Sequence, residues 1–140
     1  MGDSKYNSNN FENGFKAAVE ARLRAYAPYS KYLVGCALKP KNSNDFIVGV
    51  NVENASFGAT ICAERSAVMS MVSQFGRSEI EYVAIVTDGN PPAYPCGMCL
   101  QVLSEFVSPS TPIVIGTPSG ILSVEPFSFY MPKQFKFDRK

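Results

Sequence analysis

Three cysteines in two separate segments constrain this chain more than any other feature of its sequence. Cys62 lies in the first segment, and Cys96 and Cys99 form a C-x-x-C pair in the second. Three thiolates can bind one tetrahedral zinc ion and leave its fourth position open. The chain has no histidine, and its remaining cysteine, Cys36, lies in the apolar run 33–38, where we interpret it as a small buried hydrophobe. A zinc site with an open position favours catalysis over a structural role.

Both cysteine segments are predicted to begin a helix. Apolar residues after Cys62 recur at helical spacing as far as Phe75, and Gly76 is a plausible C-cap. A second helix is predicted over 96–107, with both cysteines of the pair on its first turn. The partial positive charge of each helix N-terminus therefore points at thiolates, which lowers their pKa and favours metal binding.

Two charged residues lie within one turn of Cys62. We expect Glu64 not to be a ligand but to stand beside the open position of the metal. A carboxylate there can accept a proton from metal-activated water and hand it on. Three thiolates on one Zn²⁺ leave a net negative charge, which weakens the metal as a Lewis acid, and Arg65 is the best candidate to compensate that charge. The pattern predicts metal-assisted hydrolysis.

The rest of the chain alternates helical and strand patterns. A helix is predicted from the apolar stripe of Phe11, Phe15, Val19, Leu23 and Tyr26, and Pro28 ends it. Strands are predicted over 33–38, 46–52, 82–87, 113–115 and 121–124. This order of elements favours an α/β fold, a mixed sheet covered by helices. No linker divides the chain, so we expect one domain over 1–140, with a loose terminus over 1–8.

Charge and hydropathy argue against several classes of function. The chain has 13 Lys and Arg against 12 Asp and Glu, which gives a net charge of +1, and no basic run exceeds two residues. A polynucleotide partner is not expected, because phosphate binding needs concentrated positive charge. The sequence has no signal peptide and no apolar run of about 18 residues, so we expect no membrane association and a cytoplasmic location.

The C-terminal segment is unusually aromatic. Between Pro126 and the end of the chain it carries Phe127, Phe129, Tyr130, Met131, Phe135 and Phe137. So many apolar side chains are expected to be buried against another apolar surface. We expect them to cover either the core of the same chain or a neighbouring subunit.

Four motifs together give the chain a specific resemblance. They are Cys62-Ala63-Glu64-Arg65, Pro95-Cys96-Gly97-Met98-Cys99, Asn51-Val52-Glu53-Asn54-Ala55, and Pro28-Tyr29-Ser30 followed by Val34-Gly35. With these motifs the chain resembles the small, homotetrameric, zinc-dependent cytidine deaminases over nearly its whole length. The resemblance implies a three-layer α/β/α sandwich with a five-stranded mixed sheet and one zinc per subunit. It also implies hydrolysis of cytidine and 2′-deoxycytidine to uridine and 2′-deoxyuridine with release of ammonia, in pyrimidine salvage.

The same resemblance implies roles for individual residues. The zinc ligands are Cys62, Cys96 and Cys99, and Glu64 passes protons to N3 of the base and to the departing amine. Arg65 supports the zinc site from outside the ligand set. The implied substrate contacts are Asn51 and Glu53 to the ribose hydroxyls, the backbone of Ala63 to the base, Tyr32 stacking on the base, and Phe57 near the sugar. Ala55 is a further substrate-binding residue, and Phe135 reaches the site of a neighbouring subunit.

The chain departs from the family's pattern at two positions near these residues. Leu100 stands where the family usually has an arginine, so charge compensation at the zinc depends more heavily on Arg65. Phe57 stands where a tyrosine is frequent, so a hydrogen bond from that hydroxyl is lost. Neither position is a predicted ligand or proton carrier. We therefore expect a changed rate or affinity and not a different reaction.

Two other functions stay open at this point. The same chemistry could act on a base within RNA or DNA, but a chain of net charge +1 without a basic stripe offers little to hold flanking nucleotides. The zinc could instead stabilise a binding or assembly module that has no turnover. Replacement of Glu64 by glutamine separates that module from an enzyme, because only a proton carrier predicts a collapse of rate.

Overall fold

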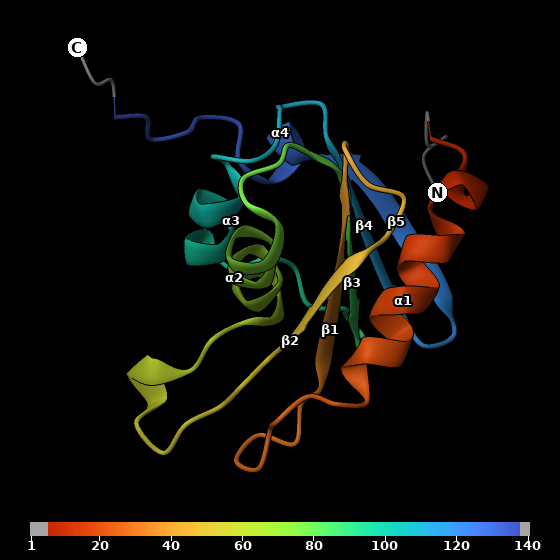
Figure 1. Cartoon of the computed structure of the whole chain (residues 1–140). Helices are drawn as coiled ribbons and strands as arrows, with labels where there is room; N and C mark the ends of the chain where they lie inside the picture. Colours follow the sequence, from red (N-terminus) through yellow and green to blue (C-terminus); the bar gives the residue numbers. More distant parts are fainter. Residues whose placement is uncertain (1–5, 138–140) are drawn as a thin grey trace.

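The computed structural model describes residues 6–137, and its centre is a mixed sheet of five strands (Figure 1). The strands lie in the order β2-β1-β3-β4-β5. β3 and β4 are parallel, and the other neighbouring pairs are antiparallel. The bounds are β1 Val34–Pro40, β2 Ile47–Val50, β3 Ile80–Thr87, β4 Pro112–Thr117 and β5 Gly120–Pro126. Every predicted strand is present, with its ends shifted by a few residues.

Helices cover both faces of the sheet (Figure 1). α1, Glu12–Arg22, packs on one face, and α2, Ala63–Phe75, lies beside α3, Gly97–Leu103, on the other. The predicted α/β/α sandwich is confirmed. The predicted loose terminus over 1–8 lies mostly outside the described residues; within them the Asn7 side chain caps the first short helix. The short elements are the 3-10 helices η1, Ser8–Phe11, and η2, Phe57–Ala59, and the helix α4, Phe127–Tyr130.

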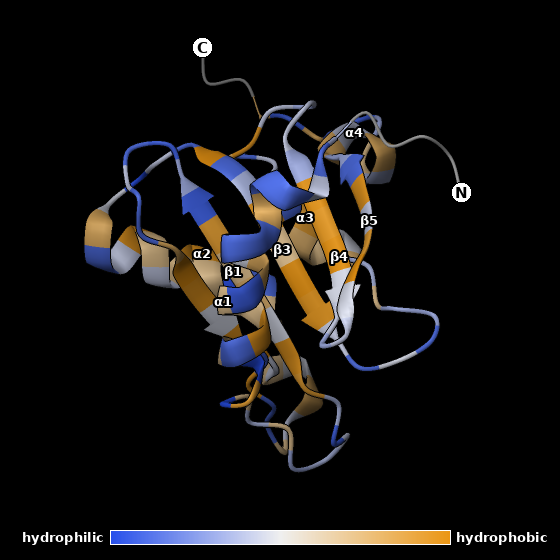
Figure 2. Cartoon of the chain, turned by 90° about the vertical axis from the view of Figure 1, so that its right-hand side faces the viewer, coloured by the Kyte–Doolittle hydropathy of each residue, from blue (hydrophilic) through white to orange (hydrophobic). Residues whose placement is uncertain are grey.

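The central strand β3 packs against both helical layers. Val83 and Ile85 belong to the core beneath α2 and α3, whereas Tyr82, Ala84 and Val86 belong to the core beneath α1. All five side chains are buried, which is why the strand reads in the sequence as a continuous apolar run. Figure 2 shows the apolar strands behind α1, whose outer side is hydrophilic.

The first helix is shorter than its apolar stripe predicts. α1 ends at Arg22, and Leu23 and Tyr26, which were expected on the buried face, are 72% and 55% exposed. Beyond the helix, the Tyr26 N–H donates to the carbonyl of Asn51 and the Glu53 N–H donates to the carbonyl of Tyr26. The chain after α1 therefore pairs with the segment after β2 instead of continuing the helix.

Arg22 fastens the end of α1 to two segments that flank one end of the sheet. Its side chain is buried, Nε donates to the Leu33 carbonyl over 3.2 Å, and the guanidinium forms an ion pair with Asp88. Leu33 directly precedes β1 and Asp88 directly follows β3. Arg22 thus joins the segment that precedes β1 to the segment that follows β3, which is the neighbour of β1 in the sheet.

Gly49 in β2 lets α2 lie close to the sheet. A Cβ atom at this position would lie 2.3 Å from the backbone nitrogen of Ala67 and 2.5 Å from the backbone oxygen of Ala63. No side chain fits such a gap, so any residue other than glycine pushes α2 away from the sheet. Because the first turn of α2 carries Glu64 and Arg65, this contact also sets how deep those side chains sit.

We expect Gly49→Ala to lower the melting temperature, because the added methyl group meets backbone atoms that cannot rotate away. Overpacking costs about 1–3 kcal/mol, which corresponds to a fall of roughly 3–12 °C for a domain of this size. Gly58→Ala is the matched control, because no heavy atom lies within 4 Å of a Cβ at Gly58. Thermal unfolding of both variants is the measurement, and an unchanged melting temperature for Gly49→Ala would contradict the close packing.

Candidate active site

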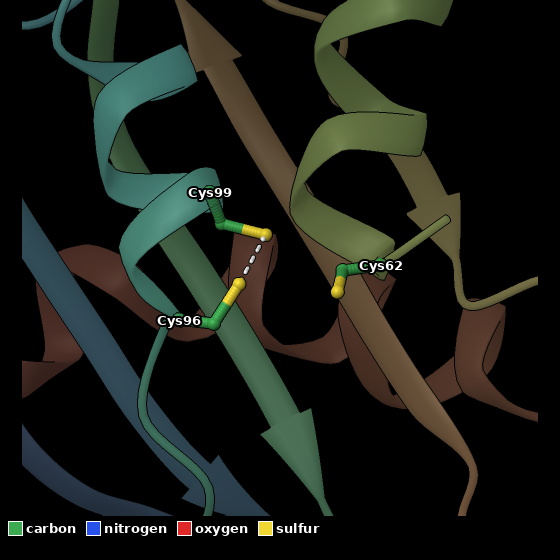
Figure 3. A group of neighbouring side chains, drawn as sticks. All are labelled: Cys62, Cys96 and Cys99. Atoms are coloured by element: carbon green, nitrogen blue, oxygen red, sulfur yellow. Dashed lines mark hydrogen bonds between the residues drawn. The ribbon is translucent and has the colours of Figure 1, made fainter. Parts of the chain in front are cut away.

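Three cysteine side chains meet where α2 and α3 begin. Cys62 is the N-cap residue of α2 and Cys96 is the N-cap residue of α3, both with extended backbone, and Cys99 lies in the first turn of α3. Their Sγ atoms lie within 4.8 Å of one another. Figure 3 shows the three sulfur atoms gathered between the two first turns. The prediction that both helices begin at a cysteine is confirmed.

The spacing of the sulfur atoms fits a zinc ion. Tetrahedral zinc with Zn–S bonds of about 2.3 Å holds two sulfur ligands about 3.8 Å apart. The Sγ atoms of Cys96 and Cys99 are 3.5 Å apart, and Cys62 completes the group. Among residues 6–137, no other histidine, cysteine or acidic side chain joins this group. The donor set is therefore three thiolates, which leaves one tetrahedral position for a non-protein ligand.

The surroundings of Cys62 favour its thiolate form. A hydrogen bond from Cys99, followed by the hydrogen bond and charge of Arg65, lowers the pKa of Cys62 to about 5. The Arg65 Nη2 atom lies 3.6 Å from the Cys62 Sγ and 3.4 Å from the Thr60 carbonyl oxygen. The same contact with Cys62 raises the pKa of Arg65, which stays cationic. A fixed positive charge thus stands beside the ligand group, as a site of three thiolates requires.

Glu64 lies in the first turn of α2, where it is buried and only 5% exposed. Burial is the main cause that raises its pKa, and a hydrogen bond with Cys99 acts in the opposite direction. A carboxyl group with a raised pKa can hold a proton closer to neutral pH than an exposed one. Cys36 is fully buried, which raises its pKa well above the usual range, so its interpretation as a core hydrophobe is confirmed.

A cavity of about 450 Å³ opens beside the cysteine group. It brings together most of the residues that the sequence singled out, whereas the buried Cys99 is not among its lining residues. The predicted residues that line it are Tyr32, Asn51, Glu53, Cys62, Ala63, Glu64 and Cys96. Ala55, Phe57 and Phe135 do not line it within this chain. Phe57 instead lines an adjoining cavity of about 380 Å³, which shares Ser30, Glu53 and Thr60 with the first.

Asn51 is buried and its amide is engaged by backbone on both sides. Its Oδ1 atom accepts from the Val34 N–H over 2.9 Å, and its Nδ2 atom donates to the Tyr32 carbonyl over 2.8 Å. A primary amide has two N–H groups and two carbonyl lone pairs, so one of each is left for a ligand. Asn51 therefore fixes the segment 32–34 and still presents polar atoms to the cavity.

Glu53 is also held by backbone. Its Oε1 atom accepts from the Tyr29 N–H over 3.0 Å and from the Ser30 N–H over 3.1 Å, and its Oε2 atom accepts from the Ser30 hydroxyl. The bonds from Ser30 are the main cause that lowers the pKa of Glu53. The carboxylate is thus ionised and points in a fixed direction at the edge of both cavities.

Several lining residues were not predicted from the sequence. Ser30, Thr60, Thr87 and Tyr94 all line the larger cavity. Tyr94 stands two residues before Cys96, and its ring centre lies 5.8 Å from that of Tyr130. Ser30 was part of a quoted motif, but no spacing rule assigns a contact to a turn serine. Only the fold shows what these side chains face.

We expect about one zinc per chain in the purified wild-type protein and its loss in Cys62→Ser, Cys96→Ser and Cys99→Ser, because each removes one ligand of a three-thiolate set. Cys36→Ser is the matched control and keeps its zinc, because Cys36 belongs to the core and not to the sulfur group. Elemental analysis of the dialysed proteins measures the ratio. Retention of zinc in all three ligand variants would contradict the site.

Over residues 6–137, none of the helices combines the length and the apolar character that crossing a bilayer requires. The longest of them, α2, has 13 residues.

The known proteins that are similar to this chain belong to one family. The family model of the cytidine and deoxycytidylate deaminase zinc-binding region matches residues 8–115. The chain is 40% identical over 120 residues to the cytidine deaminase of Halalkalibacterium halodurans, covering 86% of this chain and 89% of that protein. It is 37% identical over 116 residues to the cytidine deaminase of Sporosarcina psychrophila, covering 83% and 84% of the two chains.

Solved structures give the same result. The crystal structure of cytidine deaminase from Burkholderia pseudomallei matches with a TM-score of 0.82 and 36% identity, covering 89% of this chain and 98% of that one. The cytidine deaminase from Mycobacterium leprae matches with a TM-score of 0.74 and 38% identity over the same shares. The matched family region includes all three cysteines, so zinc is the ion that this group holds. The chain is therefore an enzyme of the zinc-binding cytidine and deoxycytidylate deaminase family.

Proposed function

We propose that this enzyme hydrolyses the C4 amino group of free cytidine and 2′-deoxycytidine, giving uridine or 2′-deoxyuridine and ammonia in pyrimidine salvage. The observation that carries the proposal is Glu64, a buried carboxyl group in the same cavity as the metal group but outside the ligand set. A structural zinc has no need of such a neighbour. The names of the relatives support cytidine as the substrate.

The protein side chains divide the chemistry between them. Bound zinc supplies the Lewis acid that lowers the pKa of a water molecule. Glu64 would take one proton from the attacking water and give it to N3 of the pyrimidine, and it would then carry the second proton of that water, from the hydroxyl group left on C4, to the departing amine. Burial favours both proton transfers, because it raises the pKa of Glu64 and lets the carboxyl group hold a proton between them. Arg65 offsets the negative charge of the thiolates.

The charge of the cavity favours nucleosides over nucleotides. In the part of the chain that the structure describes, neither lysine nor arginine lines either of the two adjoining cavities, and Glu53 lies at the edge of both. A phosphate on the sugar would meet an ionised carboxylate and no cation. The same lack of basic residues disfavours a base within RNA or DNA, since flanking phosphates need positive charge.

We expect the zinc-loaded wild-type protein to release ammonia from cytidine and 2′-deoxycytidine, and not from CMP or adenosine. Glu64→Gln keeps the shape of the side chain but removes the proton carrier, so kcat should fall by at least about 10²–10⁴-fold with zinc content and melting temperature retained. Ammonia release and the loss of cytosine absorbance are the two measurements.

The outcomes of this experiment separate the candidate functions. No release from any substrate at full zinc loading would refute the nucleoside deaminase. If ammonia were released from CMP or from a cytosine within an oligonucleotide but not from cytidine, the substrate would be a nucleotide or a nucleic acid instead of a free nucleoside. Full activity of Glu64→Gln would refute the assignment of the proton carrier.

The homotetramer and the reach of Phe135 into a neighbouring site are part of the same proposal. Phe135 is 70% exposed and lines neither cavity of its own chain, and its carbonyl accepts from Gln101 Nε2 over 3.3 Å. Met69 and Phe75 on the outer side of α2 are 51% and 70% exposed. Exposed apolar side chains such as these favour burial against another subunit.

We expect a species of about 61 kDa, four times the 15.3 kDa chain, in sedimentation equilibrium. Phe135→Ala should raise KM for cytidine about tenfold while the tetramer persists, because a buried aromatic contact with the substrate is lost. Phe129→Ala, which changes another exposed phenylalanine of the same segment, is the control. A fully active monomer would refute the shared site.

A further inference from the structure

The turn formed by Tyr29, Ser30, Lys31 and Tyr32 connects the two adjoining cavities. Ser30 lines both of them. Its hydroxyl donates to Glu53 Oε2 and accepts from the Tyr32 N–H over 3.0 Å. One small side chain thus touches the carboxylate on the sugar side and the backbone of the aromatic residue on the base side.

The backbone of this turn has an unusual conformation. Lys31 has a φ of 62°, in the left-handed region that residues other than glycine seldom adopt, and its N–H donates to the Ala27 carbonyl over 3.0 Å. Such conformations persist only where the surrounding contacts maintain them. Here the reversal at Lys31 returns the Tyr32 N–H to the Ser30 hydroxyl, which is itself bonded to Glu53. The conformation of the turn and the orientation of Glu53 therefore depend on the same hydroxyl group.

Glu53 can accept few hydrogen bonds beyond those that the protein already donates to it. A carboxylate offers about four lone-pair positions to hydrogen-bond donors. Three are used by the Tyr29 N–H, the Ser30 N–H and the Ser30 hydroxyl. The direction left for a ligand hydroxyl is set by these three donors, and two of them belong to Ser30. Without the Ser30 hydroxyl, Oε2 loses the donor that Ser30 provides, and only the two N–H bonds to Oε1 still hold the carboxylate.

We propose that Ser30 is a positioning residue, which orients the Glu53 carboxylate toward a hydroxyl group of the sugar and couples that orientation to Tyr32. The proposal rests on the proposed function, in which Glu53 accepts a hydrogen bond from the sugar. It goes beyond that function because Ser30 acts through Glu53 and needs no contact with the reacting atoms.

The test compares Ser30→Ala with the wild type on two substrates, cytidine and 2′,3′-dideoxycytidine. Zinc-loaded protein is used at high concentration so that the slower substrate is measurable. A bond to a charged acceptor is worth about a tenfold change in affinity, so Ser30→Ala should lower kcat/KM on cytidine about tenfold, chiefly through KM. On the dideoxynucleoside, which has no 2′ or 3′ hydroxyl for Glu53 to bind, the same variant should stay within about twofold of the wild type.

Two further variants complete the experiment. Ser30→Thr keeps the hydroxyl and should recover most of the activity on cytidine. Ser56→Ala, at an exposed serine of the segment after Glu53, is the matched control and should leave both substrates unaffected. Zinc content and melting temperature are recorded for each protein, so that any failure to fold is visible.

Each result decides the question. An equal loss on both substrates would overturn the proposal, because Ser30 would then act on the fold of the turn alone. No loss on either substrate would overturn it as well. A wild-type protein that converts neither substrate would refute the proposed function, and the positioning role with it.

Discussion

Three sulfur atoms on two helices can share one ion only if both helices begin at the same point, and this constraint organises the molecule. Cys62 and Cys96 are N-cap residues, so the thiolates that would hold the metal lie at the positive ends of both helix dipoles. The sheet supplies the platform on which α2 and α3 lie side by side. Gly49 brings α2 close to that platform. The same packing that closes the core therefore determines the ligand geometry.

The charges around the metal are balanced locally. Leu100, where the resemblance led us to expect an arginine, is 9% exposed and belongs to the core beneath α2 and α3. It supplies packing and no charge. Arg65 lies against Cys62 and, with the two helix N-termini, faces the thiolates. On the other side, burial keeps Glu64 ready to hold a proton. The ligands thus receive positive charge, while Glu64, the proposed proton carrier, is buried.

The sequence predicted the five strands, the main helices and the sulfur group well, because periodicity and the C-x-x-C spacing are local signals. It failed where a local pattern has a distant partner. Leu23 and Tyr26 follow the helical stripe, yet the backbone of Tyr26 pairs with Asn51 and Glu53 and both side chains are exposed. Ser30 gave no signal of its contact, since its partner lies 23 positions away and only the fold brings the two together. The roles of the substrate-contact residues stay predictions.

The two halves of the cavity are formed by different kinds of structural element. The cysteine group stands on helices rooted in the core, whereas the half that we propose to bind the sugar consists largely of two exposed segments joined by hydrogen bonds to Glu53. Substitutions on these segments have few core contacts to disturb, so they change stability little. Selection, natural or in the laboratory, can therefore vary which sugars are accepted while the reaction itself is preserved. The architecture separates the evolution of specificity from the evolution of catalysis.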